Sequence, residues 1–291
     1  MKLRDLIRDT ARRLARAKLY YGHGTDNARD EAAFLVLRGL GLPFSADLDQ
    51  EVDPAPLAPL IEKRVKQRVP AAYLLNEAWL DGVPFYVDRR VIIPRSHIAF
   101  LLRELPVEPR RILDLCTGSG CLAILAARAF PGARVDAADI SAAALEVAAR
   151  NVRTHKARVR LIRSDLFAKL EERYDLILTN PPYVATPSMR RLPPEYRYEP
   201  GMALAGGRNG LEVVARILAG AGKRLSDDGL LVCEVGENRR ALERAYPGVQ
   251  FAWPRDEVFC LERARIAAAA GAPPTRPRAA RATPLRPRHN R

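Results

Sequence analysis

The spacing of hydrophobic residues along the chain changes near residue 70. Before that point, apolar side chains recur at helical spacing with arginines between them, at Leu3, Leu6, Ile7, Ala11, Leu14 and Ala15. The same spacing over 28–40, after a cap at Asp26, predicts a second helix. Prolines at 54, 56 and 59 predict the start of a third helix, over 57–68. Residues 1–70 are therefore expected to form a helical domain. This domain is expected to recognise the substrate, with the alternative that it only buries one face of the core.

Residues 71–107 have a different pattern, which predicts a linker. The apolar runs 79–87 and 91–93 are typical of the two strands of a β-hairpin, with Asp88-Arg89-Arg90 at the turn. A helix over 98–105 is expected to follow.

Residues 108–265 alternate short apolar runs with helical segments. The runs expected as buried strands are 111–115, 134–138, 159–163, 174–179 and 230–235. Such alternation is the signature of a doubly wound α/β fold with a parallel sheet. Residues 249–253 and 258–263 are expected to form a closing strand pair. Residues 266–291, rich in Pro, Ala and Arg, are expected to be a basic disordered tail.

A glycine-containing loop follows the first of these strands. It reads Cys116-Thr117-Gly118-Ser119-Gly120 and leads into an Ala- and Leu-rich helix over 121–130. This strand-turn-helix unit is of the nucleotide-binding type. The dinucleotide fingerprint needs three spaced glycines, and Cys116 stands in the place of the first. A nucleoside ligand without a pyrophosphate is therefore expected rather than NAD.

Acidic residues accompany three successive strands. Asp114 belongs to the first, Asp139 ends the second, and Asp165 ends the third. A carboxylate in the position of Asp139 can bind both hydroxyls of a ribose. Each acid could instead cap the helix that follows it. We expect the three acids to lie in register, and together with Asn180 after the fourth strand they are harder to assign to caps.

The fourth strand ends at Asn180-Pro181-Pro182-Tyr183. An amide or ring-conjugated amine is a poor nucleophile because its lone pair is delocalised, so a catalyst has to grip its two N–H groups. The Asn180 carbonyl can accept one of them and the Pro181 backbone carbonyl the other, while Tyr183 supplies a flat wall. The alternative is a simple strand-ending turn, since Asn and Pro are common turn residues. The long loop 184–208 that follows is expected to contact the acceptor.

With these motifs, residues 20 to 265 resemble the class I S-adenosylmethionine-dependent methyltransferases that act on amino groups, and among them the HemK-like glutamine N5-methyltransferases. The resemblance implies a Rossmann-like sheet with an antiparallel last strand, S-adenosyl-L-methionine as the cofactor, and a glutamine amide of a protein as the acceptor. The catalytic residues would be Asn180, Pro181, Pro182 and Tyr183. The cofactor-binding residues would be Asp114, Cys116, Thr117, Gly118, Ser119, Gly120, Asp139, Ile140, Asp165, Leu166 and Asn180.

Further motifs resemble one branch of this family. Enzymes that modify release factors usually carry Pro-Arg-Pro-Glu-Thr where this chain has 94–98, Pro-Arg-Ser-His-Ile. Together with residues 73–79 and 22–25, this segment resembles the branch that methylates a glutamine of the large-subunit ribosomal protein L-three. His23 in the second of these motifs either contacts the substrate or only shapes a turn. Release-factor methylation remains the alternative within the family.

The net charge of +14 favours an acidic partner such as RNA or a ribosomal particle. Residues 271–291 contribute +6 of it through six arginines, which leaves +8 for the body. The tail is interpreted either as an electrostatic tether to RNA or as a solvated extension.

Cysteine and histidine usage argue against a metal site. The four cysteines have no paired spacing, and no Cys-x-x-Cys or paired His motif occurs, so we expect no zinc. A reducing, cytoplasmic setting is expected. The first nine residues are more charged than a signal peptide, so we expect none, and no run of roughly 18 apolar residues predicts a membrane span.

Two other functions compete with protein methylation. An adenine N6-methyltransferase faces the same chemical problem at an exocyclic amine, but it needs a base-reading domain or a stacking surface, and the chain has no evident one. An RNA-binding or assembly factor without turnover would not need the side chains of Asp114, Asp139, Asp165 and Asn180 together.

Overall fold

The computed structural model describes residues 1–270, with the side chains of residues 1–266. The last helix, α12 (Arg263–Ala270), occupies the first residues of the segment expected as a tail. The rest of that segment, 271–291, lies outside the described residues, and so do its six arginines.

The first 75 residues are mainly helical, and they include the segment 1–70 that was expected to be a helical domain; we call residues 1–75 the helical domain. Its helical elements are α1 (Leu3–Arg16), α2 (Ala28–Gly39), η1 (Ala55–Leu57), α3 (Ala58–Glu62), η2 (Lys63–Gln67) and α4 (Ala71–Leu75). The predicted third helix is therefore broken into short pieces of different winding. The predicted cap at Asp26 is wrong: the Asn27 side chain accepts hydrogen bonds from the backbone N–H groups of Arg29 and Asp30. An Asn at this position satisfies two of the unpaired donors of the first helical turn.

The linker does contain a β-hairpin, but its turn differs from the prediction. The hairpin pairs β1 (Glu77–Leu80) with β2 (Val83–Tyr86) through the two-residue turn Asp81-Gly82. Both turn residues have positive φ, 48° and 70°, which suits the right-handed twist of a two-residue hairpin. Asp88-Arg89-Arg90 forms a later bend after the hairpin.

A seven-stranded sheet forms the core of the larger domain, with the order β5-β4-β3-β6-β7-β9-β8. Its strands are β3 (Arg111–Leu115), β4 (Arg134–Asp139), β5 (Val159–Arg163), β6 (Tyr174–Thr179), β7 (Leu225–Glu234), β8 (Ala252–Arg255) and β9 (Val258–Glu262). The strands from β5 to β7 are parallel, whereas β9 runs antiparallel to β7 and to β8. This is the expected class I methyltransferase architecture, because the order reverses between β3 and β6 and opens a crevice there.

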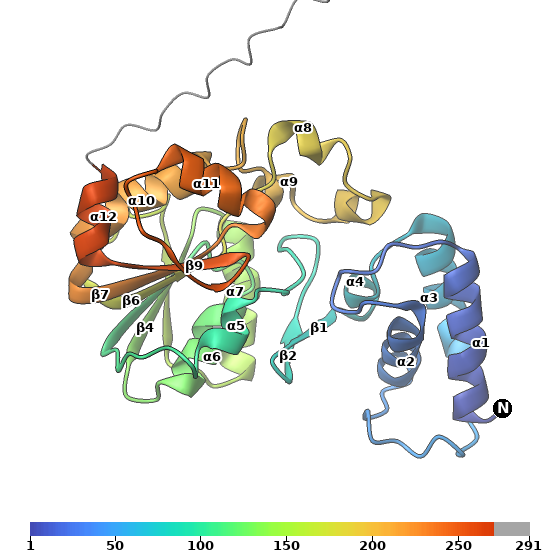
Figure 1. Ribbon diagram of the computed structural model, residues 1–291. Helices are drawn as coiled ribbons and strands as arrows, with labels where there is room; N and C mark the ends of the chain where they lie inside the picture. The colour runs from blue at the N-terminus through green and yellow to red at the C-terminus, as the bar shows by residue number, and fades with distance from the viewer. Residues whose placement is uncertain (271–291) are drawn as a thin grey trace, which may run out of the picture.

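Helices cover both faces of this sheet (Figure 1). One face carries α5 (Ile98–Leu101), α6 (Cys121–Ala129) and α7 (Ala142–Thr154), and the other carries α10 (Glu212–Arg224), α11 (Arg239–Ala245) and α12, with η4 (Gly236–Asn238) before α11. Successive strand residues point to opposite faces, so Ile112 packs on the α6 side and Leu113 on the α10 side. Both faces are buried, which explains the continuous apolar runs of the central strands.

The expected loop 184–208 contains three short helical turns: α8 (Thr186–Met189), η3 (Pro194–Tyr198) and α9 (Gly201–Leu204). The segment doubles back on itself, because Val184 donates to the Leu204 carbonyl and Gly206 donates to the Val184 carbonyl, each at 2.8 Å. In Figure 1 it extends from the sheet domain towards the helical domain, above the hairpin that joins them. We call residues 184–206 the acceptor segment.

Candidate active site

A cavity of about 230 Å³ opens at the carboxyl edge of the sheet, where the strand order reverses. Its walls come from the loop after β3, the ends of β4 and β5, the residues after β6, the end of the acceptor segment and the bend after the hairpin. Eight of the predicted site residues line it: Cys116, Gly118, Asp139, Ile140, Asp165, Leu166, Asn180 and Pro182. Six others do not: Asp114, Thr117, Ser119, Gly120, Pro181 and Tyr183.

The loop after β3 turns sharply through residues of left-handed backbone conformation. Cys116, Gly118 and Gly120 have φ of 61°, 55° and 79°. A Cβ built on Gly120 would lie 3.1 Å from the Ala148 Cβ, so this glycine lets α6 approach α7 closely. A Cβ on Gly118 would meet no atom within 4 Å and would project from the cavity wall into open space. The absence of a side chain at Gly118 therefore leaves room for a ligand.

Asp139 lies at the end of β4 and faces the cavity. Its two oxygens accept hydrogen bonds from the backbone N–H groups of Gly118 and Ser141, both at 2.9 Å. Burial raises the pKa of this carboxyl, while those hydrogen bonds oppose the rise. Each oxygen retains one free lone pair, so the carboxylate can still accept from two vicinal hydroxyls.

Asp114 is not in register with the other acids, which corrects the prediction of three acids at three strand ends. It lies within β3 opposite Ala137, two residues before the end of β4, and only 1% of its surface is exposed. Its carboxylate accepts from the Thr117 hydroxyl and the Ala123 N–H. Burial raises its pKa to about 7. Asp114 therefore braces the glycine loop from below and does not touch the cavity.

The far wall of the cavity combines an ion pair with apolar side chains. Asp165 accepts a hydrogen bond from Arg216 at 2.7 Å, which fixes both side chains beside the cavity. Ile140, which is 50% exposed, and Leu166 both line the cavity. This pair of apolar residues suits the flat faces of an aromatic base.

The Asn180 carboxamide faces the cavity without a protein partner. Within the described part of the chain, no hydrogen bond engages its side chain, and none engages the Pro181 carbonyl oxygen. The backbone around it is braced instead: Asn238 donates to the Tyr183 carbonyl at 2.7 Å, and a Cβ on Gly206 would lie 2.6 Å from the Tyr183 Cα. The Asn180 carboxamide is thus free to accept a hydrogen bond from a ligand in the cavity, whereas the Pro181 carbonyl, although free, does not line the cavity.

Tyr183 points away from the cavity, which the sequence did not reveal. Its hydroxyl donates to Glu234 at 3.2 Å, and Glu234 also accepts from the Ser96 hydroxyl at 2.6 Å and the His97 N–H at 3.0 Å. Burial raises the pKa values of Glu234 and Tyr183. This network ties the residues after β6 and β7 to the start of α5.

Several cavity residues were missed by the sequence analysis. Pro200, Met202, Ala203 and Ala205 of the acceptor segment lie in its wall, as do Arg90, Val91 and Ile92 after the hairpin. These residues are ordinary apolar or basic types without a motif. The return of the acceptor segment across the strand ends brings the first four to the cavity, and the bend after the hairpin brings the other three.

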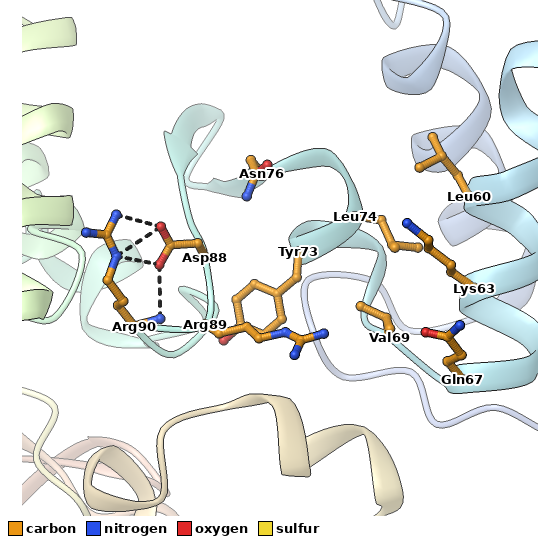
Figure 2. Close-up of a pocket in the computed structure, with 10 residues that line it drawn as sticks. All are labelled: Leu60, Lys63, Gln67, Val69, Tyr73, Leu74, Asn76, Asp88, Arg89 and Arg90. Atoms are coloured by element: carbon orange, nitrogen blue, oxygen red, sulfur yellow. Dashed lines mark hydrogen bonds and ion pairs between the residues drawn. The ribbon is translucent and has the colours of Figure 1, made fainter.

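A second, larger hollow of about 520 Å³ lies between the helical domain and the hairpin (Figure 2). Arg90 there donates to Asp88 at 2.7 Å, whereas Lys63 has no acidic partner among the described residues. Only Arg90 belongs to both hollows. The hollow in Figure 2 therefore marks the boundary between the two domains and lies apart from the strand ends.

Within residues 1–266, no group of three His, Cys, Asp or Glu side chains is placed to hold a metal ion. None of the described helices is long and apolar enough to cross a bilayer. The four cysteines are free, and burial raises the pKa of the Cys116 thiol, which keeps it protonated beside the cavity.

Comparison with known proteins identifies the family. Residues 97–191 match the model of the methyltransferase small domain. A ribosomal protein uL3 glutamine methyltransferase of Bordetella pertussis is 50% identical over 91% of this chain and 96% of its own length. Proteins of the same name are 50% identical in Bradyrhizobium diazoefficiens, over 90% of this chain and 91% of the relative, and 47% identical in Neisseria meningitidis serogroup B, over 91% and 94%. The chain is thus an S-adenosylmethionine-dependent methyltransferase and belongs to the family of ribosomal protein uL3 glutamine methyltransferases.

Proposed function

We propose that the enzyme transfers a methyl group to the side-chain amide nitrogen of a glutamine in ribosomal protein uL3. The observation that carries this proposal is the unengaged Asn180 carboxamide in the cavity wall, beside the free carbonyl of Pro181. Relatives that bear this substrate in their name match more than nine-tenths of the chain. The N-terminal helical domain is then available to recognise the protein substrate.

The residues around the cavity fit S-adenosylmethionine, which supplies a methyl group on a sulfonium leaving group when it is bound. Asp139 would accept from the ribose hydroxyls, and the apolar side chains of Ile140 and Leu166 would flank the adenine. Gly118, with no side chain, would leave space for the methionine part. Asp114 and Thr117 hold the loop in this shape from below.

Asn180 and Pro181 would activate the acceptor. A carboxamide nitrogen becomes nucleophilic when both of its N–H groups are held and its lone pair is aimed, and the two free oxygens provide such acceptors. They also favour the positive charge that develops on the nitrogen during attack. After transfer, the nitrogen proton is acidic and leaves to water, so no general base is required. Tyr183 braces this backbone through Glu234, so the flat wall that we expected from its ring is not in the cavity.

The test of this function is a transfer assay with labelled S-adenosylmethionine. Purified enzyme is incubated in parallel with uL3, with release factors, with ribosomal RNA and with ribosomal subunits that lack the modification. We expect label on one glutamine of uL3, located by tandem mass spectrometry, and none in RNA. Label in a release factor or in adenine, with none in uL3, would refute the proposal.

The same assay addresses the setting of the reaction. Comparing free uL3 with ribosomal subunits distinguishes a free acceptor from an assembled one. A ribosomal protein substrate implies action in the cytoplasm, which agrees with the four free thiols.

A further inference from the structure

Apolar packing joins the end of the helical domain to the larger domain, because one cluster contains Ala72 and Tyr73 of α4 together with Ala144 and Val147 of α7. The part of the helical domain before Val69 contacts the larger domain mainly through polar groups. No apolar cluster of the described residues contains both a residue before Val69 and a residue after Val107. Instead, residues 195–199 of the acceptor segment lie against residues 20–23 and 64–68 of the helical domain. We call this contact the polar junction.

Glu195 is the centre of the polar junction. It is fully buried, and one carboxylate oxygen accepts from the Tyr20 N–H at 2.9 Å and from Arg68 Nη2 at 2.8 Å, with Arg64 Nη1 at 3.5 Å. All three donors belong to the helical domain. A charged group of the acceptor segment is therefore enclosed by the helical domain, and its donor Tyr20 lies 175 positions earlier in the chain.

Neighbouring contacts extend the polar junction on both sides. The Arg197 guanidinium and the Tyr198 hydroxyl each donate to the Gln67 carbonyl at 2.6 Å. On the other side, Glu199 accepts from the Ile93 N–H at 3.0 Å and binds Arg95 through both of its oxygens, at 2.6 and 2.8 Å. The segment 195–199 is thus held from the helical domain and from the linker at the same time.

The polar junction is not built for stability alone. Every buried side-chain polar atom without a hydrogen-bond partner in the described residues belongs to it: Tyr21 Oη, both ring nitrogens of His23, Arg68 Nε and Glu195 Oε2. Unpaired buried polar groups destabilise a fold, so an apolar contact would be more stable here. Their concentration at one place indicates that the position of the segment matters more than the stability of the contact.

The segment held by the polar junction continues directly into the cavity. Pro200, Met202, Ala203 and Ala205 follow Glu199 and form one wall of the cofactor site. We propose that Glu195 is a positioning residue, through which the helical domain holds this wall against the bound cofactor. The proposal rests on the cofactor site and does not depend on which protein is methylated. It makes cofactor affinity a property of both domains.

The test compares two buried glutamates that share one arginine. Glu195→Gln removes the charge from the acceptor segment, and Arg68→Met removes the nearer of its two arginine partners in the helical domain. Glu31→Gln is the matched control, because Glu31 is 2% exposed and binds Arg64 at 2.6 and 3.1 Å entirely within the helical domain. Calorimetric titration with S-adenosylhomocysteine measures affinity, at a temperature where thermal melts show all variants folded.

We expect Glu195→Gln and Arg68→Met to weaken binding about tenfold each, and Glu31→Gln to change it by less than about twofold. If Glu195 only stabilised the fold, all three variants would have a lower melting temperature, and their affinities for S-adenosylhomocysteine would not differ. The proposal is overturned if Glu195→Gln binds like the wild type, or if Glu31→Gln loses as much affinity as Glu195→Gln.

Discussion

Two buried carboxylates anchor the two halves of the active site in opposite ways. On the cofactor side, Asp114 is held by neutral donors, a hydroxyl and a backbone N–H, and burial raises its pKa to about 7. On the acceptor side, Glu199 is 5% exposed and is bound by Arg95, so its pKa falls to about 2 although burial opposes the fall. The two carboxylates are buried to a similar extent. The charge of the hydrogen-bond donor therefore decides whether the pKa rises or falls.

This comparison predicts which change should destabilise each half of the active site. A carboxylate held by neutral donors is costly to ionise, so the stability of the cofactor side depends on pH. A carboxylate held by an arginine stays ionised near neutrality but depends strongly on that charged partner, although Glu199 also accepts from the Ile93 N–H and has His23 Nε2 at 3.8 Å. The predictions below separate these two behaviours.

The largest effect is expected from Arg95→Met. It leaves the Glu199 carboxylate buried without its charged partner, which should lower the free energy of unfolding by about 4 kcal/mol. Urea denaturation measures the change. Arg38→Met is the control, since Arg38 binds Glu77 in a half-exposed pair, and its loss should be about 1 kcal/mol. If both variants lost the same free energy of unfolding, burial would not be the reason why the Arg95–Glu199 pair matters more than the Arg38–Glu77 pair.

Asn180→Ala tests whether the two halves act separately. Removing one acceptor that grips the amide should reduce kcat about 100- to 1000-fold, or roughly 3 kcal/mol, because transition-state stabilisation is lost. Affinity for S-adenosylhomocysteine should stay within about threefold, since Asp139, Ile140 and Leu166 are proposed to make the main contacts to the ribose and the adenine. Single-turnover kinetics measures the rate of methyl transfer, and calorimetry measures the affinity for S-adenosylhomocysteine. Lost cofactor affinity with normal turnover would reverse the assignment.

The pH dependence of stability should reveal Asp114. Its folded pKa of about 7 exceeds its usual 3.8, so stability is lost as pH rises between these values and is constant above the folded pKa. From pH 5 to 8 the free energy of unfolding should therefore fall by about 2 kcal/mol relative to Asp114→Asn.

Glu199 provides the contrast in the same pH series. Its folded pKa of about 2 lies below its usual 4.5, so its contribution is complete above pH 4.5 and is lost only as pH falls through 2. The difference between wild type and Glu199→Gln should be flat from pH 5 to 8. The comparison would be contradicted if the difference in the free energy of unfolding between wild type and Glu199→Gln changed with pH, or if the difference for Asp114→Asn did not.

The smallest effect is expected from Tyr183→Phe. The variant removes the hydroxyl that donates to Glu234. Glu234 still accepts hydrogen bonds from the Ser96 hydroxyl and the His97 N–H. Stability should fall by about 1 kcal/mol, and most of the turnover should remain. Thermal unfolding and initial rates check both. A loss of turnover as large as that of Asn180→Ala would give the phenol a direct role.

Local patterns were sufficient for most of the fold. The apolar runs predicted the strands β3, β4, β5 and β6, and they are most continuous in the central strands β3 and β6, which are buried on both faces. The hairpin turn was misplaced because Asp81-Gly82 lies between two apolar residues and was taken for part of a strand. The cap at Asp26 failed for a related reason, since adjacent Asp and Asn residues have similar capping preferences.

The sequence by itself determined the sheet, the glycine loop and the position of Asn180 at a strand end, since these depend on residues close together in the chain. Only the tertiary structure decided that Asp114 lies beneath the loop, that Tyr183 turns away from the cavity, and that residues 200–205 form its wall. These features depend on polar contacts between distant segments, such as Glu195 with Tyr20. A buried charge can be satisfied by any suitably placed donor, so sequence spacing does not reveal which one the fold supplies.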